Sequence, residues 1–139
     1  MATAQFVVSE GILNLPEACQ DRSINVLRFN ESNATLVITR AWDIKAGEEE
    51  AFISQQLAKV KRSMKKVVMG EVGDSQVANQ PAREVSLRFE NQGVLVHEKL
   101  AITRVDDHLL VLTFSRTAPF DAPADAFWAS IKSGLQLGA

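Results

Sequence analysis

Alternation of apolar and polar positions predicts that most of this chain forms β-strands. In a strand, successive side chains point to opposite faces of the sheet, so alternation marks a half-buried segment. Seven stretches fit this pattern or the composition of a short strand: 5–8, 24–29, 34–42, 67–73, 83–90, 94–105 and 109–116. Gly11 and Pro16 predict bends in the stretch EGILNLP, and the stretches ENQG and VDDH predict hairpin turns.

Two segments show helical periodicity instead. The stretch 47–66 repeats apolar residues every three or four positions, at Ile53, Leu57, Val60 and Met64. Glutamates lie at the start of this segment, and lysines and arginines lie at its end. This order is explained better by the helix dipole than by a basic patch that binds nucleic acid or membrane. The stretch 124–135 predicts a closing helix. Together these patterns predict one α+β domain over residues 1–139, an antiparallel β-sheet with flanking helices.

Composition narrows the class of protein. The chain has 139 residues, 46% hydrophobic and 23% charged, with a formal net charge of -2, which is typical of a globular domain and less basic than a general nucleic-acid binder. The single cysteine, Cys19, favours a reducing compartment. The N-terminus has no basic region, Glu17 stands where a lipoprotein cleavage site needs a small residue, and no apolar run reaches about 18 residues. We therefore expect a cytoplasmic protein.

Residues that could perform chemistry are few. His97 lies within a predicted strand. Asp106, Asp107 and His108 are consecutive, and in an extended chain three consecutive side chains do not all point at one metal ion. Cys19 with a distant histidine could form a nucleophile pair, but an isolated cysteine is more often a small apolar residue. The sequence carries no phosphate loop or dinucleotide motif. We expect no catalytic residues, no metal and no cofactor, and predict that the protein is not an enzyme.

The strands are apolar on both faces, which a helix on one face does not explain. One predicted face is purely apolar and is assigned to the core: Leu27, Phe29, Leu36, Ile38, Leu110, Leu112 and Phe114. The opposite face mixes β-branched side chains with hydroxyls: Ile24, Val26, Thr35, Val37, Thr39, Leu109, Val111, Thr113 and Ser115. An antiparallel sheet with one covered face normally keeps its other face polar. Another part of the chain, a second subunit or a ligand must therefore cover this second face.

Several stretches together resemble the DcrB-like family. The most specific is LP followed by DRS-x-N-x-L in QDRSINVL, supported by EGILNLP, LVITR, EAFISQQLAKV and LLVLTFSRT in the same order. The resemblance covers nearly the whole chain. Because a secretory signal and a lipoprotein site are not visible, the sequence is most similar to the Eag chaperones of type VI secretion effectors. That resemblance implies a Mog1/PsbP-like fold and a homodimer.

The resemblance also implies a function. Eag chaperones hold the hydrophobic N-terminal transmembrane region of an effector, often Rhs-type, before it is loaded on the secretion spike, without inserting into a membrane. The residues expected to line such a client-binding groove are Ile24, Val26, Thr35, Val37, Thr39, Gln56, Val60, Met64 and Val111. Asp21, Arg22, Ser23 and Asn25 are expected to form a structural motif at a bend.

Two points remain open at the level of sequence. The family carries a groove glutamine on the strand that corresponds to 94–105, but this chain has none there; His97 or Lys99 lies near that position. The main alternative function is a homodimeric, non-enzymatic adaptor for a soluble protein partner, in which the second face is a plain dimer interface or lies under a loop.

Overall fold

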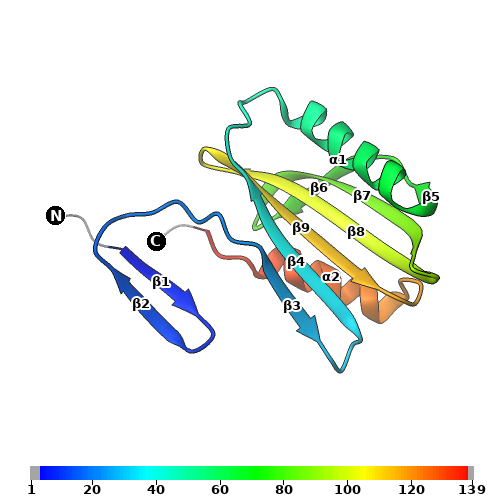
Figure 1. Cartoon of the computed structure of the whole chain (residues 1–139), viewed down its shortest axis with the longest axis horizontal. Coiled ribbons are helices and arrows are strands. Elements are labelled where there is room, and N and C mark those ends of the chain that lie inside the picture. The colour runs from blue at the N-terminus through cyan, green and yellow to red at the C-terminus, as the bar shows by residue number, and fades with distance from the viewer. Residues whose placement is uncertain (1–3, 138–139) are drawn as a thin grey trace.

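The computed structural model describes residues 4–137 and contains one main sheet with a helix on each side (Figure 1). The elements in chain order are β1 (Ala4–Val8), β2 (Gly11–Leu15), β3 (Asn25–Phe29), β4 (Ala34–Ala41), α1 (Glu49–Ser63), β5 (Lys65–Met69), β6 (Gly73–Val77), β7 (Gln80–Asn91), β8 (Val94–Val105), β9 (His108–Arg116) and α2 (Ala122–Gly134).

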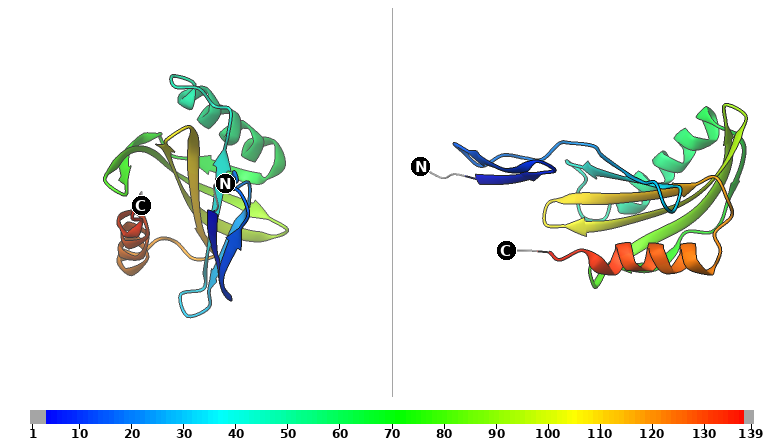
Figure 2. Two further views of the ribbon diagram at one scale, coloured as in Figure 1. Left: turned by 90° about the vertical axis from the view of Figure 1, so that its left-hand side faces the viewer. Right: turned by 90° about the horizontal axis from the view of Figure 1, so that it is seen from below.

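The main sheet has seven strands, and every pairing in it is antiparallel. Its order is β3-β4-β9-β8-β7-β5, with β6 also paired to β7. Helices α1 and α2 lie on opposite sides of the sheet (Figure 2). The prediction of an α+β domain with an antiparallel sheet and flanking helices is confirmed. Strands β1 and β2 form a separate two-stranded sheet.

Several elements differ from the sequence prediction. Residues 11–15 form β2 rather than a bend, because Gly11 begins the strand at a φ of 153° and Pro16 follows its end. Helix α1 ends at Ser63 instead of continuing to residue 66, since Met64 is extended. Strand β5 therefore begins two residues early and ends at Met69. Strand β6 was missed because its sequence, GDSQV, has almost no apolar signal.

The sheet separates two apolar cores. On the α2 side, Phe114 stacks on Phe127 and Trp128, with ring centroids 5.4 and 5.8 Å apart. On the α1 side, Ile53 packs with buried residues of β7, β8 and β9, including Leu109 and Val111. The assignment of Leu27 to the core is wrong, because its side chain is 45% exposed on the outer strand β3. Its neighbours on that face, Leu36 and Phe114, are buried as predicted.

A polar network fastens α2 to the sheet. Lys132 Nζ donates to Glu84 Oε1 at 2.6 Å, and Trp128 Nε1 donates to Glu84 Oε2 at 3.1 Å. Ser75 Oγ also donates to Glu84 at 2.9 Å. Burial alone would raise the pKa of Glu84, but these three bonds outweigh it and hold that pKa below its usual range. The ionised carboxylate is therefore part of how α2 is held.

We expect Lys132→Met to lower the free energy of unfolding by about 2 to 3 kcal/mol, because it leaves a partly buried carboxylate without its cation. Urea unfolding at pH 7 measures this. Because the pKa of Glu84 is lowered, its contribution is present above the usual carboxylate range and is lost as the pH falls below it. Lys59→Met on the exposed side of α1 is the matched control. Equal stability of the two variants would exclude this role for the network.

Candidate functional site

Helix α1 covers only part of its side of the sheet. The buried residues beneath it come from β7, β8 and β9: Val85, Leu87, Phe89, Leu100, Ile102, Leu109 and Val111. Between them and the outer edge of β3 the same face is only partly covered or exposed. We call this area the β3–β4 strip and define it by Val26, Thr35, Val37, Thr39, Thr113 and Ser115.

Strand register places these six residues on one face. Val26 lies opposite Val37, and Val37 lies opposite Thr113. In the next row, Thr35 lies opposite Ser115. Residues directly opposite one another in antiparallel strands share a face, so the strip carries β-branched apolar side chains and hydroxyls together. Arg28 of β3 lies opposite Thr35 at the outer margin and donates to Thr35 Oγ1 at 3.1 Å. Val26 is 63% exposed at its outer margin, which leaves apolar surface open to a partner.

Five of the residues expected to bind a client lie in the strip or beside it. Val26, Thr35, Val37 and Thr39 belong to it, and Ile24 precedes β3 with 68% of its surface exposed. Val111 has the right face but is only 7% exposed, since α1 packs over it. That residue is therefore part of the core and is not accessible to a client.

The three expected residues from α1 and its end are partly buried. Val60 and Met64 are partly buried and pack against the α1-side core. Met64 is the residue that caps α1 rather than part of its last turn. Gln56 is also partly buried. These residues contribute first to holding α1 on the sheet.

The DRS motif fixes the chain where it enters β3. Asp21 Oδ1 accepts hydrogen bonds from the backbone N and the Oγ of Ser23, at 2.9 and 2.6 Å. Arg40 of β4 lies 3.6 Å from the Asp21 carboxylate, and Trp42 Nε1 donates to the Asp21 carbonyl at 3.2 Å. The Ser23 bonds, aided by Arg40, hold the pKa of Asp21 below its usual range. This motif therefore ties residues 21–23 to β4.

The other two residues of the motif have different roles. Asn25 accepts a hydrogen bond from Arg40 at 3.2 Å and so adds to the same anchor. Arg22 is exposed and donates to Gln20 at 2.7 Å. The anchor determines the position of Ile24 and Val26 at the edge of the strip.

Glu98 is a polar residue on this face that the sequence analysis missed. It lies opposite Ser115 of the strip on one side and the buried Leu87 on the other. His97 and Lys99 point to the opposite face, where Lys99 pairs with Asp125 of α2 at 3.0 Å. In a strand, Glu98 points to the same face as Leu100 and Ile102, and this alternation was the signal that the sequence offered for its position. Burial raises the pKa of the Glu98 carboxyl from its usual value of 4.5 to about 7.

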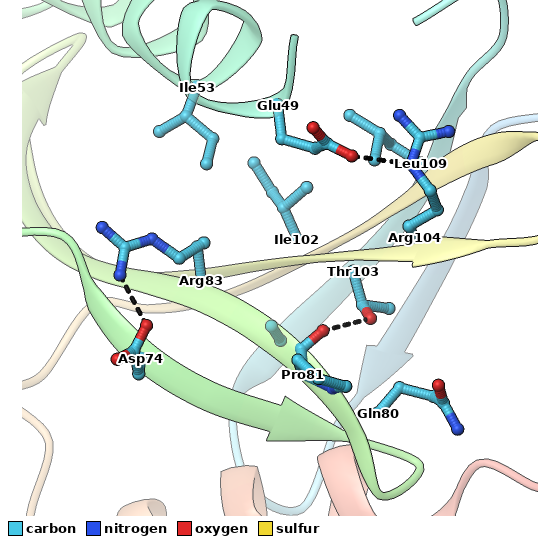
Figure 3. Close-up of a pocket in the computed structure, with 11 residues that line it drawn as sticks. Glu49, Ile53, Asp74, Gln80, Pro81, Arg83, Ile102, Thr103, Arg104 and Leu109 are labelled. Carbon is cyan, nitrogen blue, oxygen red and sulfur yellow. Dashed lines mark hydrogen bonds and ion pairs between the residues drawn. The ribbon is translucent and has the colours of Figure 1, made fainter. Parts of the chain in front are cut away.

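A pocket of about 350 Å³ lies beside the first turn of α1 (Figure 3). Glu49 accepts from Arg104 at 2.7 Å, and Arg83 pairs with Asp74 at 2.6 Å and with Glu50 at 2.8 Å. Its charged groups already neutralise one another, and no strip residue lines it. We interpret the Glu49–Arg104 and Glu50–Arg83 pairs as the attachment of α1 to the sheet, whereas the Asp74–Arg83 pair joins β6 to β7.

Within residues 4–137, no group of three or more histidine, cysteine, aspartate or glutamate side chains is placed to hold a metal ion. No helix in that range is long and apolar enough to cross a bilayer. The strip therefore remains the candidate functional surface, and contact with another molecule is the role that its residues fit best.

We expect Glu98→Gln to stabilise the protein at pH 8 by up to about 3 kcal/mol, because the native carboxyl binds its proton more tightly than the unfolded one. Stability associated with Glu98 is fully present below pH 4.5 and is lost as the pH rises to about 7. The variant should therefore match the wild type near pH 4.5 and exceed it at pH 8. Thermal melting across this range, with Glu31→Gln in the exposed β3–β4 turn as control, measures the effect. A constant difference between variant and wild type at every pH would contradict it.

Comparison with known proteins agrees with this architecture. PA94 from Pseudomonas aeruginosa, a protein of unknown function, superimposes with a TM-score of 0.75 at 19% identity, covering 100% of this chain and 99% of that one. The PsbP protein of Synechocystis (CyanoP) superimposes with a TM-score of 0.57 at 9% identity, covering 95% and 90%. The fold is therefore Mog1/PsbP-like. A search of curated protein sequences found no match. The model of the DcrB family matches residues 10–134, and this chain belongs to the DcrB family.

Proposed function

We propose that this protein is a type VI secretion chaperone that holds the hydrophobic N-terminal transmembrane region of an effector and aids its loading on the secretion spike. The observation that carries the proposal is the β3–β4 strip, an open area of apolar and hydroxyl side chains on an otherwise well-packed sheet. Membership of the DcrB family and the sequence resemblance to Eag chaperones support it.

The chemistry of the strip suits a membrane helix as client. Such a helix is apolar on all sides and aggregates in water unless another apolar surface covers it. Val26 and Val37 supply that surface, with Ile24 beside them. Among the described residues, the hydroxyls of Thr39 and Ser115 have no side-chain hydrogen bond, so they are free to bond small polar groups or carbonyls of the client.

Glu98 adds a condition on the client. A partly buried carboxyl with a pKa of about 7 is a mixture of protonated and ionised forms at neutral pH. The protonated form can donate a hydrogen bond to a client carbonyl, whereas the ionised form only accepts. A client that covers the strip removes more water from Glu98 and favours the protonated form unless it brings a donor.

We expect Ile24→Asp with Val26→Asp to leave the protein folded, because both side chains are more than 60% exposed. Binding of the client should weaken by about a hundredfold or more, since two apolar contacts are lost and two carboxylates face an apolar helix. Co-purification with the apolar N-terminal segment of the effector encoded beside its gene measures binding, and thermal melting checks the fold.

Val68→Asp provides the matched control, because Val68 is 52% exposed on β5, at the far edge of the sheet. It should bind the client like the wild type. If the wild type fails to retain the apolar segment, the chaperone proposal is wrong. If it retains a folded soluble partner by the same strip instead, the adaptor alternative replaces the chaperone proposal. If the double variant binds normally, the client lies elsewhere.

A further inference from the structure

Four side chains that can donate hydrogen bonds lie together on the α2-side face of β7 and β8. Arg88 lies opposite His97, and Ser86 lies opposite Lys99. Residues opposite one another in antiparallel strands share a face, and so do positions two apart along one strand. The four therefore form a two-by-two block, which lines a pocket of about 360 Å³. We call it the β7–β8 donor pocket and define it by these four residues.

The donor pocket lies on the other side of the sheet from the β3–β4 strip. Helix α2 packs over buried residues of its face, such as Ala101, but Ser86 and Arg88 are exposed there. Leu87 and Glu98 also line the pocket, and strand alternation directs their side chains to the α1 side. Among the described residues that line it, none therefore brings a carboxylate to the α2 side.

Two cations near the pocket already have carboxylate partners. Lys99 Nζ lies 3.0 Å from Asp125, and Arg116 pairs with Asp121 at 3.2 Å. Asp121 is the N-cap of α2, and Asp125 lies in its first turn. These pairs hold the start of α2 on the sheet, so both acids are already engaged.

Arg88 differs from these cations, because among the described residues it takes part in no ion pair. Glu90, two residues along on the same face, pairs with Lys66 at 3.1 Å instead. Arg88, His97 and Arg116 lie opposite one another on three adjacent strands, where like charges repel. Burial, together with the two arginines, holds the pKa of His97 below its usual range. An anion beside Arg88 and His97 would relieve this repulsion.

The form of the pocket favours a carboxylate carried by a larger molecule. A single guanidinium without a partner matches one carboxylate, which its planar fork binds through two hydrogen bonds. The Ser86 hydroxyl and the Lys99 ammonium can donate beside it. Small-molecule sites bury most of their ligand, but Ser86 and Arg88 are exposed and leave this pocket open to water. A side chain of another protein does not need such enclosure.

We propose that the β7–β8 donor pocket binds an acidic segment of a partner protein, with one carboxylate of that segment held by Arg88 and Ser86. Charge complementarity between this segment and Arg88, His97 and Lys99 selects the partner. The pocket and the strip lie on opposite faces of the sheet, so the site goes beyond the proposed function and binds a second protein rather than the apolar client.

NMR titration of the full chain tests the site at a residue that belongs to it. His97 and His108 are the two histidines of the chain, so their ring signals can be followed separately. The probe is an acetylated and amidated peptide of four glutamates, and the same peptide of glutamines is the neutral control. The glutamate peptide should raise the pKa of His97, because a nearby carboxylate stabilises the imidazolium form. It should leave the ring signals of His108, at the start of β9, in place.

Arg88→Gln removes the guanidinium without a partner and should weaken binding of the glutamate peptide about tenfold or more, since a charge-assisted hydrogen bond is lost. Arg62→Gln makes the same change of charge at an exposed position in the last turn of α1 and should bind like the wild type. Both replaced side chains are exposed, and thermal melting checks that both variants fold. Equal weakening in the two variants would mean that net charge alone attracts the peptide, and the site would be wrong.

Two further outcomes of the titration would overturn the proposal. If acetate at the same carboxylate concentration moves the His97 signals as far as the glutamate peptide does, the pocket takes small carboxylates and the protein partner is wrong. If neither moves them, the pocket is only a solvated basic surface. These measurements involve no client, so the chaperone proposal stands or fails independently of them.

Discussion

The width of the sheet governs the rest of this structure. Six strands follow one another from β3 to β5, and at about 4.8 Å between strands they span about 24 Å. A helix with its side chains is about 10 to 12 Å wide, so one helix cannot cover such a face. Helix α1 is placed over β7, β8 and β9 by its packing on Leu109 and Val111 and by the Glu49–Arg104 pair. The uncovered remainder is the β3–β4 strip.

On this open part of the face, two neighbouring rows of residues differ in polarity, and the second row is the more polar. Val26, Val37 and Thr113 form one row, and Arg28, Thr35, Ser115 and Glu98 form the next. Water reaches the outer residues of both rows, but Glu98 lies farther in, beside Leu87, and this burial raises its pKa. A solvated surface would not need this graded mixture of apolar and hydroxyl groups. It is suited to a partner that is mostly apolar with a few polar groups.

Alternation and periodicity predicted the elements whose faces differ in burial, and failed where that difference vanishes. Strands β4, β8 and β9 were found because each has a buried face with several apolar residues, whereas β6 was missed because Val77 is its one apolar side chain apart from Gly73. Leu27 was assigned to the core by parity, but an edge strand exposes both faces. The alternation of side chains also correctly placed Val37 and Val111 on the same face of the sheet. The position of α1, which buries Val111 and leaves Val37 partly open, depends on tertiary packing that spacing does not encode.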